Sequence, residues 1–190
     1  MRLLKTFSVS LVAVLALGAI SVTGASSHEF EASATVLALL KSHGPQLFKL
    51  GVVHLACASF NAHGSISLLK TKTEVVTGSY TGCSSAMGTV TEPINTEYEF
   101  NAEGTVAILK PIKVTIVAAG LKCEVTISAQ SGLKTITYNN IGSEILMFAK
   151  VAEISSTGAG ALCTYATDKT GIYTAGVLFK IENGGVIKWV

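Results

Sequence analysis

The chain has few of the residues that nucleic-acid-binding sites use. Arg2 is its only arginine, and Asp168 is its only aspartate. Without Arg2 and Lys5, the 14 basic residues fall to 12 and equal the 12 acidic ones, so the rest of the chain carries no formal net charge. Phosphate recognition favours a basic stripe and the bidentate guanidinium group. We therefore expect no nucleic-acid partner.

The common catalytic motifs are also missing. The sequence contains no Gly-x-Ser-x-Gly elbow, no phosphate-binding glycine loop and no dinucleotide fingerprint. Glu97 and Glu99 share one strand face, and paired carboxylates serve glycoside hydrolysis, but a solvated face opposite Tyr98 and Phe100 explains them more simply. Asp168 lies in a segment typical of a turn. We predict that the protein is not an enzyme, with a small secreted hydrolase using Glu97 and Glu99 as an alternative.

Long apolar runs are absent except near the start of the sequence. Basic residues in 1–5 precede an uncharged apolar run of about 13 residues over 8–20, and small residues follow over 22–26. This order is typical of a secretory signal peptide, whereas a membrane-spanning helix needs about 20 apolar residues. We predict a signal peptide over residues 1–25, a secreted, extracellular or cell-envelope location, and no integral membrane helix.

Alternation of apolar and polar residues with a period of two dominates the remaining chain. In residues 122–128, one face carries Cys123, Val125 and Ile127 while the other carries polar side chains. This is the pattern of a half-buried strand. The same pattern occurs in residues 53–59, 113–117 and 173–181.

Residues 35–41 fit either two turns of helix or an early strand, and the strand period around them favours a strand. The sequence predicts an all-β fold: a single antiparallel β-domain over residues 26–190, formed as a sandwich or a partly closed barrel. We expect about 10 to 12 short strands.

The chain contains an internal echo. Residues 60–70 match residues 100–110 at six of eleven positions, and Cys83 and Cys123 follow at the same offset. Duplicated β-units, each contributing one cysteine, would explain the match. Convergence on an Asn-Ala-x-Gly turn would explain it equally well, and both interpretations predict that the two segments are hairpins.

Four cysteines, Cys57, Cys83, Cys123 and Cys163, follow the predicted signal peptide. Disulfides form after export, and the chain has no Cys-x-x-Cys pair that would indicate redox chemistry. Three connectivities are open, and proximity in the chain favours Cys57–Cys83 and Cys123–Cys163. We predict two disulfides that staple the fold.

We expect no cofactor and no metal site. A strand over residues 53–60 would place His54 and Cys57 on opposite faces, so they cannot share an ion. Cleavage after Ala25 would put His28 third from the new amino terminus, where its imidazole and the terminal amine can wrap Cu(II) or Ni(II). The simpler interpretation is an exposed histidine near a terminus.

Four segments resemble exported bacterial proteins that are known only as uncharacterised. They are HEFEAS at residues 28–33, EYEFNAEGTV at 97–106, AQSGLKT at 129–135 and GGVIKW at 184–189. The resemblance spans nearly all of the chain after residue 25, including the four cysteines. It implies a secreted β-protein with disulfides and no known activity, and it brings no catalytic residue with it.

These observations favour a non-enzymatic secreted or cell-surface domain with a structural or adhesive role, acting as a cell-envelope component or on a protein partner. An extracellular binder of an apolar small molecule is the main alternative, because 49% of the chain is hydrophobic. An outer-membrane barrel is a weaker alternative, since aromatic residues are too few for two interfacial girdles.

Overall fold

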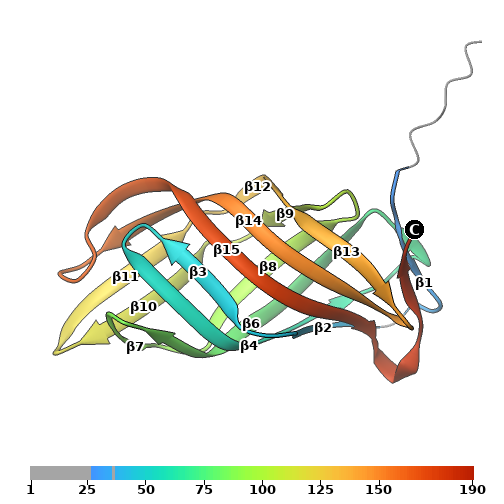
Figure 1. The fold of residues 1–190 in the computed structure, drawn as a ribbon, viewed down its shortest axis with the longest axis horizontal. Helices are drawn as coiled ribbons and strands as arrows, with labels where there is room; N and C mark the ends of the chain where they lie inside the picture. The colour runs from blue at the N-terminus through green and yellow to red at the C-terminus, as the bar shows by residue number, and fades with distance from the viewer. Residues whose placement is uncertain (1–26, 36) are drawn as a thin grey trace, which may run out of the picture.

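The computed structural model describes residues 27–35 and 37–190, so the predicted signal peptide lies outside the described residues. Strands dominate this part of the chain (Figure 1). The first eight are β1 (Phe30–Ala32), β2 (Leu37–Ser42), β3 (Gln46–Leu50), β4 (Val53–Ser65), β5 (Lys70–Thr71), β6 (Thr73–Ser85), β7 (Gly88–Val90) and β8 (Ile94–Asn101). The others are β9 (Thr105–Ile108), β10 (Ile112–Ala118), β11 (Leu121–Ile127), β12 (Gln130–Lys134), β13 (Ile136–Ile141), β14 (Glu144–Ala159), β15 (Tyr165–Ile181) and β16 (Ile187–Trp189).

The predicted all-β antiparallel fold is confirmed, but its strands are more numerous and some are longer than expected. The described residues form sixteen strands, and β4, β6, β14 and β15 each have 13 to 17 residues. The β14–β15 pair shifts register three times beyond Val151 without ending. Bulges of this kind bend and twist long strands, so breaks in the sequence alternation did not mark strand ends. A single 3₁₀ turn at Glu182–Gly184 is the only helical element of the described residues.

The main sheet folds back onto itself. Its neighbouring strands run in the order β6–β7–β10–β11–β14–β15–β2–β4, and the last of these, β4, also pairs with the first, β6. The strands β8, β9 and β12 branch from the edge of β6, and β13 branches from β14. The result is a sandwich-like body elongated in the view of Figure 1, rather than a clean barrel.

Alternation along the strands places one set of side chains inside this body. The predicted inward residues Cys123, Val125 and Ile127 of β11 are buried, as are Val53 and Leu55 of β4. Residues 37–42 form β2, so the strand interpretation of this segment is confirmed, and Val36 lies outside the described residues. The core is continuous from one end of the body to the other.

A separate small sheet caps one end of the body. It has the order β16–β1–β5, and Phe30 of β1 pairs with both Trp189 of β16 and Thr71 of β5. Phe30 packs edge-on against Phe179 and Tyr138 of the main sheet. The cap therefore joins the beginning and the end of the described chain over the interior (Figure 1).

The two segments of the internal echo adopt different local structures. Asn101 to Gly104 form the predicted turn, in which Gly104 N–H donates to Asn101 O and Glu103 N–H donates to Asn101 Oδ1. Residues 61–64, by contrast, continue inside β4. The predicted turn is therefore present in the second segment and absent at residues 61–64 of the first, which instead form one arm of the antiparallel β4–β6 pair.

Candidate functional site

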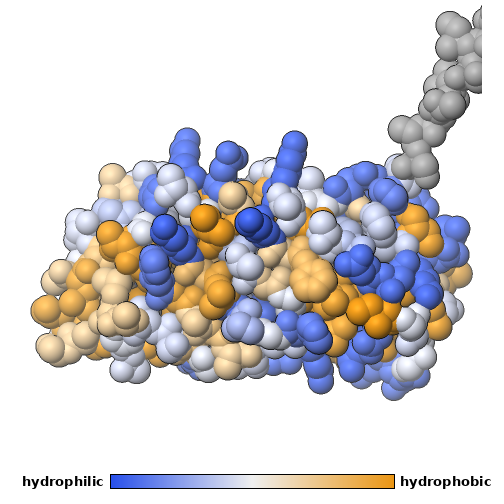
Figure 2. Space-filling model, viewed as in Figure 1, coloured by the Kyte–Doolittle hydropathy of each residue, from blue (hydrophilic) through white to orange (hydrophobic). Residues whose placement is uncertain are grey.

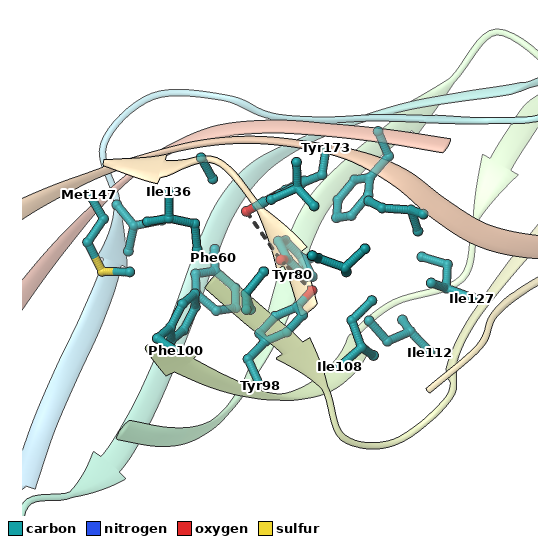
Figure 3. A pocket seen from close by; sticks show the side chains of 17 residues that line it. Phe60, Tyr80, Tyr98, Phe100, Ile108, Ile112, Ile127, Ile136, Met147 and Tyr173 are labelled. Carbon is teal, nitrogen blue, oxygen red and sulfur yellow. Dashed lines mark hydrogen bonds between the residues drawn. The ribbon is translucent and has the colours of Figure 1, made fainter. Parts of the chain in front are cut away.

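Aromatic side chains fill the middle of the interior. Phe60 stacks on Tyr80 with ring centroids 4.6 Å apart, and Phe48 meets Tyr80 edge-on at 5.1 Å. Tyr98 contacts Phe60, and Phe100 contacts Tyr98. These residues come from β3, β4, β6 and β8, so the cluster packs four strands of the main sheet together (Figure 3).

A chain of hydrogen bonds runs through this aromatic cluster. The hydroxyls of Tyr98 and Tyr80 lie 2.9 Å apart, and Tyr80 donates to the Tyr173 hydroxyl at 3.2 Å. Tyr173 in turn donates to Gln46 Oε1 at 2.6 Å. The Gln46 amide donates to the carbonyls of Gly176 and Gly44, so this fully buried side chain has partners for both ends.

Burial sets the protonation state of these tyrosines. It raises the pKa of Tyr80, Tyr98 and Tyr173 above the usual value of 10.0. All three hydroxyls are therefore neutral at physiological pH. The chain can donate and accept hydrogen bonds, but none of its members is a phenolate base.

A small enclosed cavity lies beside the tyrosine chain. Phe60, Phe100, Ile136 and Met147 point into it, together with aliphatic residues of β9, β10 and β11 (Figure 3). Its volume is about 40 Å³. Sites for drug-sized ligands measure about 300–1,000 Å³, whereas about 10–15 Å³ admits one water. The cavity is thus an apolar packing void, large enough for a very small apolar molecule.

A second hollow lies on the outside of β4 and β6. It is lined by hydroxyl-bearing residues, by His63, and by Gly64 and Glu74, which are buried where their neighbours in the strands are exposed. Glu74 is only 5% exposed, and its Oε1 has no hydrogen-bond partner among the described residues. Burial raises the pKa of this carboxyl to about 7. Sequence reasoning missed Glu74, because residues 73–77 show no clean alternation that would place it inside.

Uncharged loop tips gather at the end of the body opposite the cap. We call this surface the apolar end: Ala86 and Met87, residues 117–121 (VAAGL) and residues 159–162 (AGAL). The tips are adjacent because β7 pairs with β10, and Leu162 N–H donates to Lys122 O. Figure 2 shows apolar colours concentrated at this end.

The turn of the β10–β11 hairpin carries an apolar residue, Ala119, at a position where polar residues or glycine are preferred. Ala119 has φ of 50° and is followed by Gly120 with φ of 78°. Asn, Asp or Gly is preferred where φ is positive in a two-residue hairpin. An alanine at this position is strained, and such strain is typical of functional segments. Leu121 beside it is 48% exposed.

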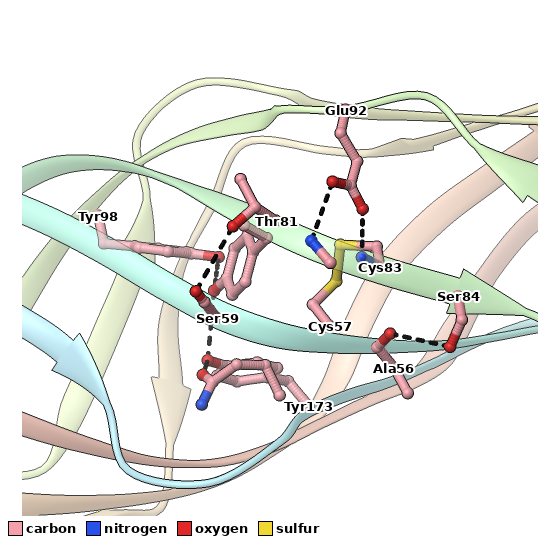
Figure 4. Close-up of a disulfide and its surroundings, with 12 residues drawn as sticks. Ala56, Cys57, Ser59, Thr81, Cys83, Ser84, Glu92, Tyr98 and Tyr173 are labelled. Atoms are coloured by element: carbon pink, nitrogen blue, oxygen red, sulfur yellow. Dashed lines mark hydrogen bonds between the residues drawn. A yellow bond between two sulfur atoms is a disulfide. The ribbon is translucent and has the colours of Figure 1, made fainter.

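The structure contains two disulfides, Cys57–Cys83 and Cys123–Cys163, which are the pairs that chain proximity favours. The first joins directly paired positions of β4 and β6. Beside it, the Glu92 carboxylate accepts the N–H groups of Gly82 and Cys83 (Figure 4).

The second disulfide lies at the apolar end. Both Cys123 and Cys163 are buried there, Cys123 at the start of β11 and Cys163 in the loop between β14 and β15. It fixes the loop over residues 159–162 against the β10–β11 hairpin. The disulfides therefore hold strand pairs and loop tips.

Among the described residues, no third group links the candidate carboxylates Glu97 and Glu99 into an acid–base pair. Glu97 forms an ion pair with Lys110 at 2.5 Å, and Glu99 stands opposite Ala107 and Val75. Asp168 lies in an irregular part of β15 rather than in the predicted turn. Its carboxylate accepts the N–H and hydroxyl of Thr170 at 2.8 Å, which lowers the pKa of Asp168.

The histidines lie apart from one another. His54 is exposed on β4, while Cys57 is buried in its disulfide. The His28 ring stacks on Trp189 at 4.2 Å, and its backbone N–H donates to Glu103 Oε1 at 2.9 Å. Copper binding at a processed terminus would have to break this hydrogen bond, because that site uses the same backbone nitrogen.

Two further findings concern the described residues as a whole. No three His, Cys, Asp or Glu side chains among them lie close enough to hold a metal ion together. Over the same residues, no helix is long and apolar enough to cross a membrane.

Comparison of this chain with protein-family models, with curated proteins and with solved structures finds no match in any of the three.

Proposed function

We propose that this protein is an extracytoplasmic, non-enzymatic β-domain with an adhesive role, and that the apolar end is its contact surface. The observation that carries the proposal is the strained apolar turn at Ala119 and Gly120. Asparagine at residue 119 would relieve the strain and hydrate the tip. Alanine at residue 119 keeps the tip apolar at a conformational cost.

The rest of the body supports this role. The cavity in the interior measures only about 40 Å³, whereas hollows on the outer surface measure about 440 and 540 Å³. Contact surfaces of proteins often combine a rigid frame with apolar residues that lose water on association. The Cys123–Cys163 disulfide supplies rigidity where the apolar tips are.

Envelope sedimentation tests the proposal. Purified protein is mixed with the isolated envelope of the cells that produce it, and the bound fraction is measured after centrifugation. We expect Leu121→Asn and Ala119→Asn to lower the bound fraction several-fold. Ala119→Asn is also expected to raise the free energy of unfolding, since Asn tolerates positive φ better than Ala. Loss of binding with a gain of stability cannot come from misfolding.

Ile141→Asn is the matched control. Ile141 is 50% exposed, nearly the same fraction as Leu121 at 48%. It lies at the β13–β14 hairpin, at the capped end of the body. Its substitution should leave the bound fraction unchanged. Equal retention of all three variants and the unmodified protein would refute a contact role for the apolar end.

The enclosed cavity supports a second candidate function, the binding of a very small apolar molecule. Its lining is apolar and aromatic, which favours such a guest over water. Native mass spectrometry of protein purified from its source would show an adduct of constant mass. Absence of an adduct, with no displacement of an apolar dye, would leave adhesion as the better explanation.

A further inference from the structure

The wall of the body is open along one line, between β12 and β14. These two strands lie side by side (Figure 1), but no ladder joins them. On this edge, β14 pairs with β13 up to Ala149 and with β11 from Ser156 onward. Within the described chain, residues 151–154 have no strand partner on this edge, and β12 pairs only with β9. We call the gap between residues 131–134 and residues 151–154 the seam.

The side chain of Gln130 holds the seam together at one end. Its amide donates to the carbonyl of Ser155 at 3.2 Å, and its oxygen accepts the Ser155 N–H at 2.9 Å. One side chain thus imitates a rung of a β-ladder, and the Ser128 N–H donates to the same carbonyl. The other end is held by a backbone hydrogen bond from Lys150 N–H to Thr135 O.

Both borders of the seam deviate from regular strand geometry. β12 shifts register against β9, and its Gly132 has φ of 73°. β14 is irregular beyond Val151, where Glu153 has φ of 61°. Thr135, directly after β12, has φ of 84°, which is rare for a β-branched residue. Bulges leave residues unpaired and twist a strand, which accounts for the missing ladder.

The seam lies between the enclosed cavity and the outer surface. On the inside, Leu133, Val151 and Ile154 line the cavity of about 40 Å³. On the outside, residues 130–135 and 152–153 surround a hollow of about 500 Å³. The alternation along the strands agrees, because the three lining residues are buried and residues 152–153 are exposed. Leu133 borders both spaces, so its side chain stands between them.

We propose that the seam is the entrance through which a small apolar molecule reaches the enclosed cavity, with Leu133 as its gate. The proposal rests on the cavity as a ligand site, which is the second candidate function above. A guest passes when Leu133 changes rotamer and the contact between Gln130 and Ser155 releases. No strand ladder has to break, because the described residues form none across the seam.

The opposite wall of the cavity is closed by continuous pairing. Ile127 of β11 also lines the cavity. It pairs with Ile112 of β10 on one side and with Ser156 of β14 on the other. A guest entering beside Ile127 would have to separate two ladders, so entry through the seam is the less costly route.

The lining of the cavity decides which guest it accepts. The residues beside the seam are aliphatic, and the tyrosine hydroxyls are engaged in their own hydrogen-bond chain. Water would find few free partners there, whereas apolar cavities in proteins stay dry and take up xenon or benzene. Xenon is therefore the probe for the smallest class of guest.

Xenon NMR measures both the affinity and the rate of exchange between bound and free xenon. In the unmodified protein, xenon should cause saturable shifts at the backbone amides of residues 147 and 151. Gln130→Ala should speed the exchange about tenfold, because hydrogen bonds that hold the seam are lost. Its dissociation constant should stay unchanged, since Gln130 does not line the cavity.

Leu133→Ala and Ile127→Ala form a matched pair. Both remove the same number of carbon atoms from the lining, so both should enlarge the cavity and tighten xenon binding. Only Leu133→Ala removes the gate, so its exchange should be at least about tenfold faster than that of Ile127→Ala. Gln130→Ala provides an independent measurement, because it leaves the core intact.

The outcomes separate the entrance from the site that it serves. Absence of saturable xenon shifts in the unmodified protein and all variants would refute the cavity as a ligand site, and the entrance with it. Saturable binding with an exchange rate unchanged by Gln130→Ala, and equal in Leu133→Ala and Ile127→Ala, would overturn the entrance alone. Envelope binding should be unaffected in Gln130→Ala, because the apolar end is untouched.

Discussion

The hydroxyl of Tyr173 donates a 2.6 Å hydrogen bond to Oε1 of Gln46, a residue 127 positions earlier in the chain. This bond joins the neighbouring strands β15 and β3 on their buried side, and Tyr80 extends the connection to β6. Gln46 has no exposed surface, so water cannot replace a lost partner. The polar chain therefore specifies how these strands are arranged, while the surrounding rings supply most of the buried apolar area.

Tyr173→Phe should lower the free energy of unfolding by about 1–3 kcal/mol, because it leaves Gln46 Oε1 buried without its donor. Tyr98→Phe is the matched control. It removes the outer end of the chain and leaves Tyr80 bonded to Tyr173, so about 0.5–1.5 kcal/mol is expected. Urea unfolding followed by tyrosine fluorescence measures both values. A larger loss for Tyr98→Phe than for Tyr173→Phe would contradict this ranking.

The free energy of unfolding should fall as pH rises, because the buried carboxyl of Glu74 keeps its proton in the folded state. The folded-state pKa of about 7 lies above the usual 4.5, so the folded protein keeps a proton that the unfolded chain releases. The free energy of unfolding then decreases between about pH 4.5 and about pH 7, by up to about 3 kcal/mol, and stays low above that range. His63 and Glu74 line the same hollow, and Glu97 and Glu99 lie on the neighbouring strand β8, opposite Thr77 and Val75.

Glu74→Gln should remove this decrease and make the protein more stable than the unmodified one in mildly alkaline buffer. Urea midpoints measured on both sides of neutrality decide the matter, with Glu99→Gln as the control that keeps the slope. A Glu74→Gln protein that loses stability with pH as steeply as the unmodified one would place the effect on another group.

Each disulfide should contribute substantially to stability. Loops of 26 and 40 residues are closed by Cys57–Cys83 and Cys123–Cys163. The chain-entropy account gives about 3.5–4 kcal/mol for loops of this length. Replacing either pair by alanine should lower the urea midpoint accordingly. Peptide mapping without reductant checks the pairing, and fragments that join Cys57 to Cys123 or Cys163 would contradict it.

Gly78 permits the close approach of β4 and β6. It stands directly opposite Ala62, and a Cβ at Gly78 would collide with the Ala62 side chain and with the Asn61 carbonyl. Gly78→Ala should therefore cost about 1–3 kcal/mol, because the backbone must move to relieve the overlap. Ser79→Ala, one residue along, should change stability by less than about 0.5 kcal/mol. Thermal unfolding of the two variants makes the comparison, and equal melting temperatures would contradict it.

The strands were predictable where one face of a segment is purely apolar. In β15, Ala175, Val177, Phe179 and Ile181 are buried on one face as their alternation predicts. Closure of the sheet was not predictable, because pairing of β4 with both β2 and β6 depends on contacts between distant segments. Period-two patterns identify the face of a strand but not its neighbours.

The polar residues of the interior escaped the sequence analysis for a related reason. Gln46 and Glu74 are polar residues at inward positions, where alternation leads one to expect apolar side chains. Gln46 is tolerated because Tyr173 and the Gly176 carbonyl bind it, and both of these partners are more than a hundred residues away. Glu74 is accommodated by the missing side chain of Gly64. Neither compensation is visible until the strands are paired.

The cap has a consequence for biosynthesis. Phe30 of β1 pairs with Trp189 of β16, so β1 cannot form this pairing until β16 has been synthesised. Until then β1 can pair only with β5 on its other edge, through Thr71 and Lys70. The β16–β1–β5 sheet can be completed only after residue 189 has left the ribosome and, for an exported protein, the translocation channel.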